Sequence, residues 1–164
     1  MTRTIVTPLL LLTIATAILR GQEQQLKPNL SRTWIFNAQK SSLKVPVPSS
    51  MTLRITHKDP QIRFARTQVY GDKTFEWKLE AITDDKKEVV QKSLAYTSHS
   101  RIYWQGGSLV LDQKLVADDG TTVNDVVTYT LSTDGQSLEA VEQLVTVGAT
   151  GSVTNKWTYE RRTQ

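Results

Sequence analysis

The side chains best suited to catalysis are few in this chain. It has two histidines, His57 and His99, and no cysteine among its 164 residues. Ser98-His99-Ser100 contains the residue types of a nucleophile and its base, but on a strand His99 would point away from both serines. His57 and Asp59 supply two ligands, whereas a metal site usually needs three or four. We therefore expect a protein that is not an enzyme and that uses no metal and no cofactor.

Other charged and glycine-rich positions are better explained as turns and solvated surface. The acidic pairs Asp84-Asp85 and Asp118-Asp119 have the residue type that tight turns favour. Gly106-Gly107 precedes a strand-like run and lacks the helix N-terminus of a phosphate-binding loop. The 20 basic and 16 acidic side chains are intermixed and leave a net charge of +4, whereas a nucleic-acid-binding protein tends to gather its basic residues on one face. We expect no nucleic-acid partner.

The elements that must position any site are short strands. In TFEWKLEAI (74–82) apolar and polar residues alternate, which is typical of a half-buried strand. SMTLRITHK (50–58) has the same period, as do later runs as far as SVTNKWTYER (152–161). Turn signals such as Gly71-Asp72, Asp119-Gly120 and Asp134-Gly135 separate these runs. DDKKEVVQKSLAY (84–96) contains good helix formers, but Val89-Val90 and the strand-like residues after it favour a turn followed by a strand.

About nine or ten strands joined by short hairpins predict an all-β fold. A long antiparallel meander has to protect its edges, and closure into a barrel is the usual way. We therefore predict an antiparallel up-and-down meander that closes into a barrel of about eight to ten strands. KSSLKVPVPSS (40–50), with two prolines, is interpreted as an extended edge or a lid over the barrel mouth.

A barrel of this size has an interior that is either filled by side chains or able to hold one small ligand. The candidate ligand contacts are therefore polar or aromatic residues on inward-facing tracks, where every second residue is apolar. Arg66, for example, follows Ile62 and Phe64 at the strand period. The predicted contacts are Arg66, Gln68, Tyr70, Trp77, Gln113, Asp125, Tyr129 and Asn155. A bulge in any of these strands would instead turn the polar residue to solvent.

The N-terminus has the layout of a secretory signal peptide. An apolar run of about 15 residues follows Arg3, and Ala15-Thr16-Ala17 provides a small-residue cleavage pattern. The run is shorter than the roughly 20 residues that span a membrane. We expect a signal peptide (1–21), a polar spacer (22–30) and one β-barrel domain (31–162), with no stable membrane insertion after cleavage. The predicted location is secreted or periplasmic, and the lack of cysteine favours a bacterial envelope or secreted protein over a disulfide-stapled module.

Four stretches of the chain carry a family resemblance. LSRTWIFNAQKS (30–41), MTLRITHKDPQIRFARTQ (51–68), DGQSLEAVEQ (134–143) and KWTYER (156–161) resemble small secreted bacterial lipocalin-like proteins of unestablished function. Those proteins typically begin Leu-Ser-Gly-Thr-Trp, and Arg32 stands here in place of the glycine. The resemblance extends over about residues 30–162. It implies a lipocalin-like, calycin-type barrel in which Trp34 closes one end and Arg161 or Arg162 stacks over its ring.

Two functions from different classes remain open at this point. The first is an exported module that binds a small, mostly apolar or amphipathic ligand inside the barrel. The second is an envelope or secreted protein-interaction domain with a filled core and no ligand. The volume of the interior separates the two, because an empty cavity of roughly 300 Å³ or more favours a ligand. The sequence leaves the oligomeric state open.

Overall fold

Ten antiparallel strands follow one another along residues 27–162, the part of the chain that the computed structural model describes. They are β1 (Arg32–Phe36), β2 (Ser50–Lys58), β3 (Gln61–Tyr70), β4 (Lys73–Ile82), β5 (Val89–Lys92), β6 (Tyr96–Gln105), β7 (Ser108–Ala117), β8 (Thr122–Leu131), β9 (Ser137–Thr146) and β10 (Val153–Arg161). The predicted signal peptide, residues 1–21, and spacer residues 22–26 lie outside the described residues.

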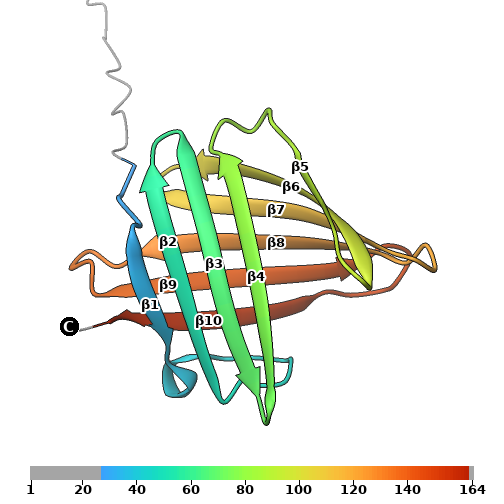
Figure 1. Cartoon of the computed structure of the whole chain (residues 1–164), viewed down its shortest axis with the longest axis horizontal. Helices are drawn as coiled ribbons and strands as arrows, with labels where there is room; N and C mark the ends of the chain where they lie inside the picture. Colours follow the sequence, from blue (N-terminus) through green and yellow to red (C-terminus); the bar gives the residue numbers. More distant parts are fainter. Residues whose placement is uncertain (1–26, 163–164) are drawn as a thin grey trace, which may run out of the picture.

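The strands form one ten-stranded sheet in the order β4-β3-β2-β1-β10-β9-β8-β7-β6-β5. Each strand pairs with its sequence neighbour, except that β4 and β5 are the two edges and β1 pairs with β10. The sheet curls so that β2–β4 cross in front of β7–β10, while β5 lies to the right of β4 in this view (Figure 1). Gln91 Nε2 on β5 donates to the Lys78 carbonyl oxygen on β4 at 3.0 Å, so one hydrogen bond bridges the two edges. The predicted antiparallel meander that closes into a barrel is confirmed, and the barrel is nearly closed.

Short hairpins join the strands where the sequence places glycine. Gly71 follows β3 and Gly106 follows β6, both with φ of 60°. A residue with a Cβ rarely adopts this left-handed conformation, so glycine is the natural choice in both turns. These two glycines therefore permit the tight turns that join β3 to β4 and β6 to β7.

Helical structure is nearly absent from the described residues, as the sequence pattern predicts. A single 3-10 turn, η1 (Ala38–Lys40), follows β1, and the Asn37 side-chain oxygen accepts hydrogen bonds from the backbone N–H of Gln39 and Lys40. The interpretation of residues 84–96 as a turn followed by a strand is confirmed by β5. Within residues 27–162, no helix has the length and apolar character needed to cross a membrane.

The strand register decides which side chains enter the barrel. β3 and β4 pair without interruption from Gln61↔Ile82 to Tyr70↔Lys73. β8 and β9 pair in the same way from Val123↔Thr146 to Leu131↔Leu138. The period-2 alternation therefore continues along both hairpins, and the bulge that would turn Arg66 or Asp125 to solvent is not present there.

The segment between β1 and β2 crosses one end of the barrel. Ser42 pairs with Lys156 of β10, and Ser49 N–H donates to the Val69 carbonyl oxygen of β3, so the segment runs from one wall to the other (Figure 1). Leu43 and Val45 pack against the core. Of the two interpretations of this proline-containing stretch, the lid fits the structure better than the extended edge.

Candidate functional site

The interior of the barrel has an apolar half and a polar half. The apolar half is tightly packed, and Leu30, Trp34, Ile102, Leu109 and Leu138 are fully buried there. Farther along the same strands the inward side chains become polar. The inward residues of the polar half are Arg66, Gln68, Tyr70, Ser98, Ser100, Gln113, Asp125, Glu142 and Asn155. A site for a polar or amphipathic molecule must therefore lie in this second half.

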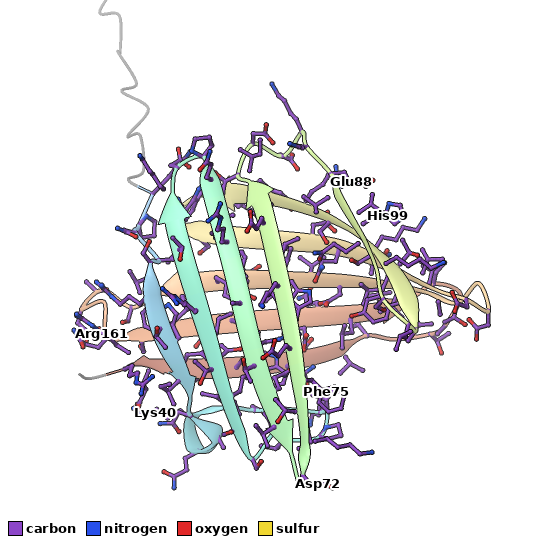
Figure 2. The ribbon with its side chains drawn as sticks, viewed as in Figure 1. Lys40, Asp72, Phe75, Glu88, His99 and Arg161 are labelled. Carbon is purple, nitrogen blue, oxygen red and sulfur yellow. The ribbon has the colours of Figure 1, made fainter. Side chains whose placement is uncertain are left out.

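A pocket of about 570 Å³ opens into the polar half. β3 and β4 form one wall, and Pro46, Ser93 and Tyr96 line the other side. The β3 and β4 residues that line it are Arg66, Gln68, Tyr70, Lys73, Phe75, Glu76 and Trp77. Phe75 lies near the start of β4, next to the turn that carries Asp72 (Figure 2). A smaller hollow of about 350 Å³ lies where β3 and β4 approach Lys87 and Val89.

Arg66 and Trp77 form the end of the pocket wall that lies farthest from the β3–β4 turn. The two residues are direct cross-strand partners on β3 and β4, and the Arg66 guanidinium carbon lies 5.1 Å from the centroid of the Trp77 ring. Phe64 packs against the same indole with ring centroids 6.0 Å apart. Arg66 Nε is buried and has no hydrogen-bond partner among the described residues. A cation held by a ring face and otherwise unpaired is available to an anionic group.

Two carboxyl groups face the polar half of the interior from β8 and β9, outside the set of residues that line the pocket. Glu142 of β9 accepts hydrogen bonds from Asn155 Nδ2 at 2.7 Å and Trp157 Nε1 at 3.0 Å. Asp125 of β8 is 9% exposed, and its Oδ1 has no hydrogen-bond partner within residues 27–162. Burial, together with the negative charge of Glu142, raises the pKa of the Asp125 carboxyl to about 7, and the positive charge of Arg66 opposes this rise. Asp125 thus differs from Glu142 in having no donor of its own.

The predicted contact residues do not all reach the pocket. Arg66, Gln68, Tyr70 and Trp77 line it, whereas Asp125 is buried in the polar half and is not among the lining residues. Gln113 and Asn155 face inward but bind protein partners, because Gln113 Nε2 donates to Ser100 Oγ at 2.8 Å and Asn155 Oδ1 accepts from the Lys44 backbone N–H at 2.7 Å. Tyr129 is 4% exposed and packs against Phe64 in the apolar half. These side chains lie on the inner face of the barrel, and their contact with a ligand stays a prediction.

The apolar half ends at Trp34, the residue predicted to close the barrel. Its ring is fully buried, and its indole N–H donates to the Leu30 carbonyl oxygen at 3.2 Å, which ties the incoming chain over this end. Arg161 is its cross-strand partner on β10, but the Arg161 side chain is exposed at the end of the strand (Figure 2). The cation–π contact found among the described residues is that of Arg66 with Trp77, not one over Trp34.

The two histidines occupy separate surroundings. His99 points outward toward Glu88, with Nδ1 3.0 Å from Oε2, while Ser98 and Ser100 are buried on the inner face. His57 Nε2 lies 3.8 Å from Asp59 Oδ1, and its ring lies 5.4 Å from that of Trp104. In the described part of the chain, no group of three histidine, aspartate or glutamate side chains could hold a metal ion.

Several inward or lining residues were missed by the sequence interpretation. Glu142 is the most important of them, and it alternates with Leu138, Ala140 and Leu144 on one track of β9. That alternation was visible in the sequence and would have identified it. Pro46 and Ser93 carried no such signal, because they lie in connecting segments whose position depends on closure of the barrel.

Comparison with known proteins identifies the fold. No family model matches the chain, and no curated protein matches its sequence. Among solved structures, a secretory abundant heat soluble protein of Ramazzottius varieornatus is similar at a TM-score of 0.57 and 13% identity, covering 84% of this chain and 98% of that one. Lipid binding protein 8 of Caenorhabditis elegans gives 0.54 and 11%, covering 82% and 96%. The fluorescent protein UnaG gives 0.55 and 15%, covering 81% and 97%. The chain has the lipocalin-like barrel fold.

At these identities the likeness concerns the barrel alone. The lipocalin-like barrel of this protein therefore shares its topology with the three structures, while the side chains that line its pocket are its own. The opposed Arg66 and Asp125 have to be interpreted from their own surroundings.

Proposed function

We propose that this protein is a binding module, and not an enzyme, whose barrel takes up a small, mostly apolar or amphipathic molecule. The observation that carries the proposal is the pocket of about 570 Å³ beside Arg66 and Trp77. Small-molecule sites commonly measure about 300–1,000 Å³ and combine apolar walls with a few placed polar groups. The name of one structural neighbour, lipid binding protein 8, agrees with a ligand of this kind.

The distribution of large side chains supports a cavity over a filled interior. Phe64 and Leu111 pack the apolar half. Phe75, which could have filled the polar half, is 51% exposed at the rim of the pocket. Trp77 lines the pocket and leaves the space beside it open. The polar half thus retains room for a guest.

We also propose that the protein is exported to the periplasm or the medium, as its resemblance to small secreted bacterial proteins suggests. The support is the apolar run after Arg3 and the Ala15-Thr16-Ala17 pattern. Intact mass measurement of the protein recovered from its own host tests this. We expect a mature chain that has lost about 17–21 N-terminal residues. A cell-associated chain that still begins at Met1 would contradict export.

Binding can be tested with N-phenyl-1-naphthylamine, an uncharged apolar dye that fluoresces when it leaves water. We expect one dye molecule per barrel and at least about tenfold weaker binding to Trp77→Ala. Trp104→Ala is the matched control, because it removes an indole from the inner face of β6 outside the pocket lining and should leave the dye affinity within about twofold. If the wild-type protein binds no dye, or if both variants behave alike, the pocket is not the binding site.

A second function has one observation in its favour. Exposed apolar side chains surround the pocket mouth, namely Phe75 itself, Val47 next to Pro46, and Leu94 next to Ser93. Such a rim also fits the alternative that the domain docks on a partner and holds no ligand. Native mass spectrometry of the protein purified from its own host separates the two. A co-purifying small molecule supports ligand binding, whereas a co-purifying polypeptide with an empty barrel supports docking.

A further inference from the structure

Two ionisable groups of opposite sign face the barrel interior without a partner. Arg66 on β3 and Asp125 on β8 each contain a buried polar atom, Nε and Oδ1, that forms no hydrogen bond with any residue in 27–162. Asp125 is 9% exposed. Buried polar atoms in folded proteins are nearly always satisfied by protein or water, so an orphan on each of two walls requires an explanation.

The two groups share one interior but do not neutralise one another. Within the described residues, neither Arg66 nor Asp125 has an oppositely charged group within 4.0 Å. The positive charge of Arg66 nevertheless acts on the Asp125 carboxyl and opposes the rise of its pKa, so the two side chains lie near one another in the interior. Arg66 is held over the Trp77 ring, and Asp125 stands beside Gln113, its cross-strand partner, whose amide donates to Ser100. The Arg66 guanidinium therefore stays at β3 and β4, and the Asp125 carboxyl stays at β7 and β8.

The neighbouring groups decide what such a site accepts. Glu142 already receives two hydrogen bonds, so Asp125 is the carboxyl that needs a donor. A purely anionic guest would pair with Arg66 but leave Asp125 unsatisfied next to Glu142 and add another negative charge. A purely cationic guest would pair with Asp125 but leave the guanidinium unpaired. A buried charge without a partner destabilises a protein strongly. A ligand that pairs with both Arg66 and Asp125 should therefore bind more tightly than one that pairs with either residue alone.

We propose that the ligand is a zwitterionic amphiphile, with an anionic group that pairs with Arg66, an ammonium group that pairs with Asp125, and an apolar tail against Trp77 and Tyr96. This inference rests on the proposed function, because the anionic group and the tail occupy the same pocket, while the ammonium group extends past the pocket lining to Asp125, which does not line it. An anion such as a carboxylate presents two oxygens to the planar guanidinium. The ammonium group provides the donors that Asp125 Oδ1 lacks.

Three probes of equal tail length test the proposal: α-aminodecanoic acid, decanoic acid and decylamine. Each is titrated below its micellar concentration at pH 8 against the complex of the protein with N-phenyl-1-naphthylamine, with calorimetry as an independent readout. We expect the zwitterion to bind at least about tenfold more tightly than either singly charged probe. In the Arg66→Gln variant, the affinity for α-aminodecanoic acid should fall to that for decylamine. In the Asp125→Asn variant, it should fall to that for decanoic acid. Arg63→Gln is the control, because Arg63 is on the same strand but points outward to Glu80.

The outcomes separate this inference from the proposed function. Preference for decanoic acid or decylamine over the zwitterion would overturn it, as would an Asp125→Asn variant that binds the zwitterion like the wild type. Failure of all three probes to displace a dye that does bind would overturn it too, while the binding function would stand. If the dye itself does not bind, both proposals fall. Far-ultraviolet circular dichroism of each variant confirms that the barrel is folded.

Discussion

Arg66 and Trp77 are direct cross-strand partners, and the guanidinium of the first lies 5.1 Å from the ring centroid of the second. The contact occupies the face of the cation but leaves Arg66 Nε without a hydrogen bond among the described residues. The protein thus contains an incompletely solvated charge in its pocket wall. Such an arrangement should lower the stability of the folded protein, and this cost can be measured.

Arg66→Met should stabilise the folded protein while weakening its binding of charged ligands. Methionine keeps an unbranched side chain against Trp77 and removes the unpaired charge, which is worth about 1–2 kcal/mol of unfolding free energy. Urea denaturation of the ligand-free protein measures the change. Arg63→Met, on the outer face of the same strand, should change stability by less than about 0.5 kcal/mol. A destabilised Arg66→Met variant would show that the guanidinium is already satisfied.

Asp125→Asn should remove a pH dependence of stability. The folded-state pKa of about 7 is higher than the ordinary value of 3.8, so between these pH values the folded protein binds more protons than the unfolded chain. Ionisation of Asp125 therefore destabilises the wild-type protein as the pH rises through this window, and the loss is complete above about pH 7. Burial is the largest cause of the raised pKa, the negative charge of Glu142 adds to it, and the positive charge of Arg66 opposes it.

We expect the Asp125→Asn variant to be more stable than the wild type by a few kcal/mol at pH 8, with a difference that shrinks toward pH 4. Denaturant titrations at several pH values measure this, and Asp118→Asn in an exposed turn serves as the control. A constant difference across the range would mean that Asp125 titrates like an exposed carboxyl.

Trp34→Ala should destabilise the barrel without affecting the pocket. The ring is fully buried in the apolar half, and removal of such a side chain costs roughly 3–5 kcal/mol. Ile35→Ala, at the adjacent position that faces outward, should cost much less because Ile35 is 38% exposed. Thermal unfolding measures both variants, and dye binding should keep its stoichiometry in each. Unchanged stability of Trp34→Ala would refute its role in closing this end.

Asn155→Ala should loosen the lid. Asn155 is fully buried and links the Lys44 backbone N–H to the Glu142 carboxylate, so its removal leaves a buried donor and a carboxylate oxygen short of a partner. We expect a loss of about 2 kcal/mol and faster hydrogen exchange at the Lys44 amide. The Ser42 amide is the internal control, because it donates to the Lys156 carbonyl oxygen. Exchange at Lys44 that remains as slow as in the wild type would argue against this anchor.

The period-2 alternation was sufficient to predict the strands, their inward tracks and the meander. It works because successive side chains of a strand point to opposite faces, so one apolar face implies a core. Glycine at Gly71 and Gly106 supplied the turns for the same local reason. Even the inward position of Arg66 and Asp125 follows from counting in steps of two from Phe64 and Val127.

Other features of the site depend on contacts between distant parts of the chain. Arg66 and Asp125 are about 60 residues apart in sequence, and local alternation contains no information on the distance between their side chains in the curled sheet. Local alternation does not predict the exposure of Phe75 either. The Phe75 side chain is exposed because β4 is an edge strand and Phe75 lies near its start.

By itself the sequence determined that this chain is an antiparallel barrel with polar residues turned inward. The tertiary structure alone decided that Arg66 stacks on Trp77, that Glu142 is satisfied while Asp125 is not, and that a pocket remains beside Arg66 and Trp77. The physical reason is that alternation and turn chemistry act over a few residues, whereas pairing of buried charges and the volume left between packed walls depend on how the whole sheet closes.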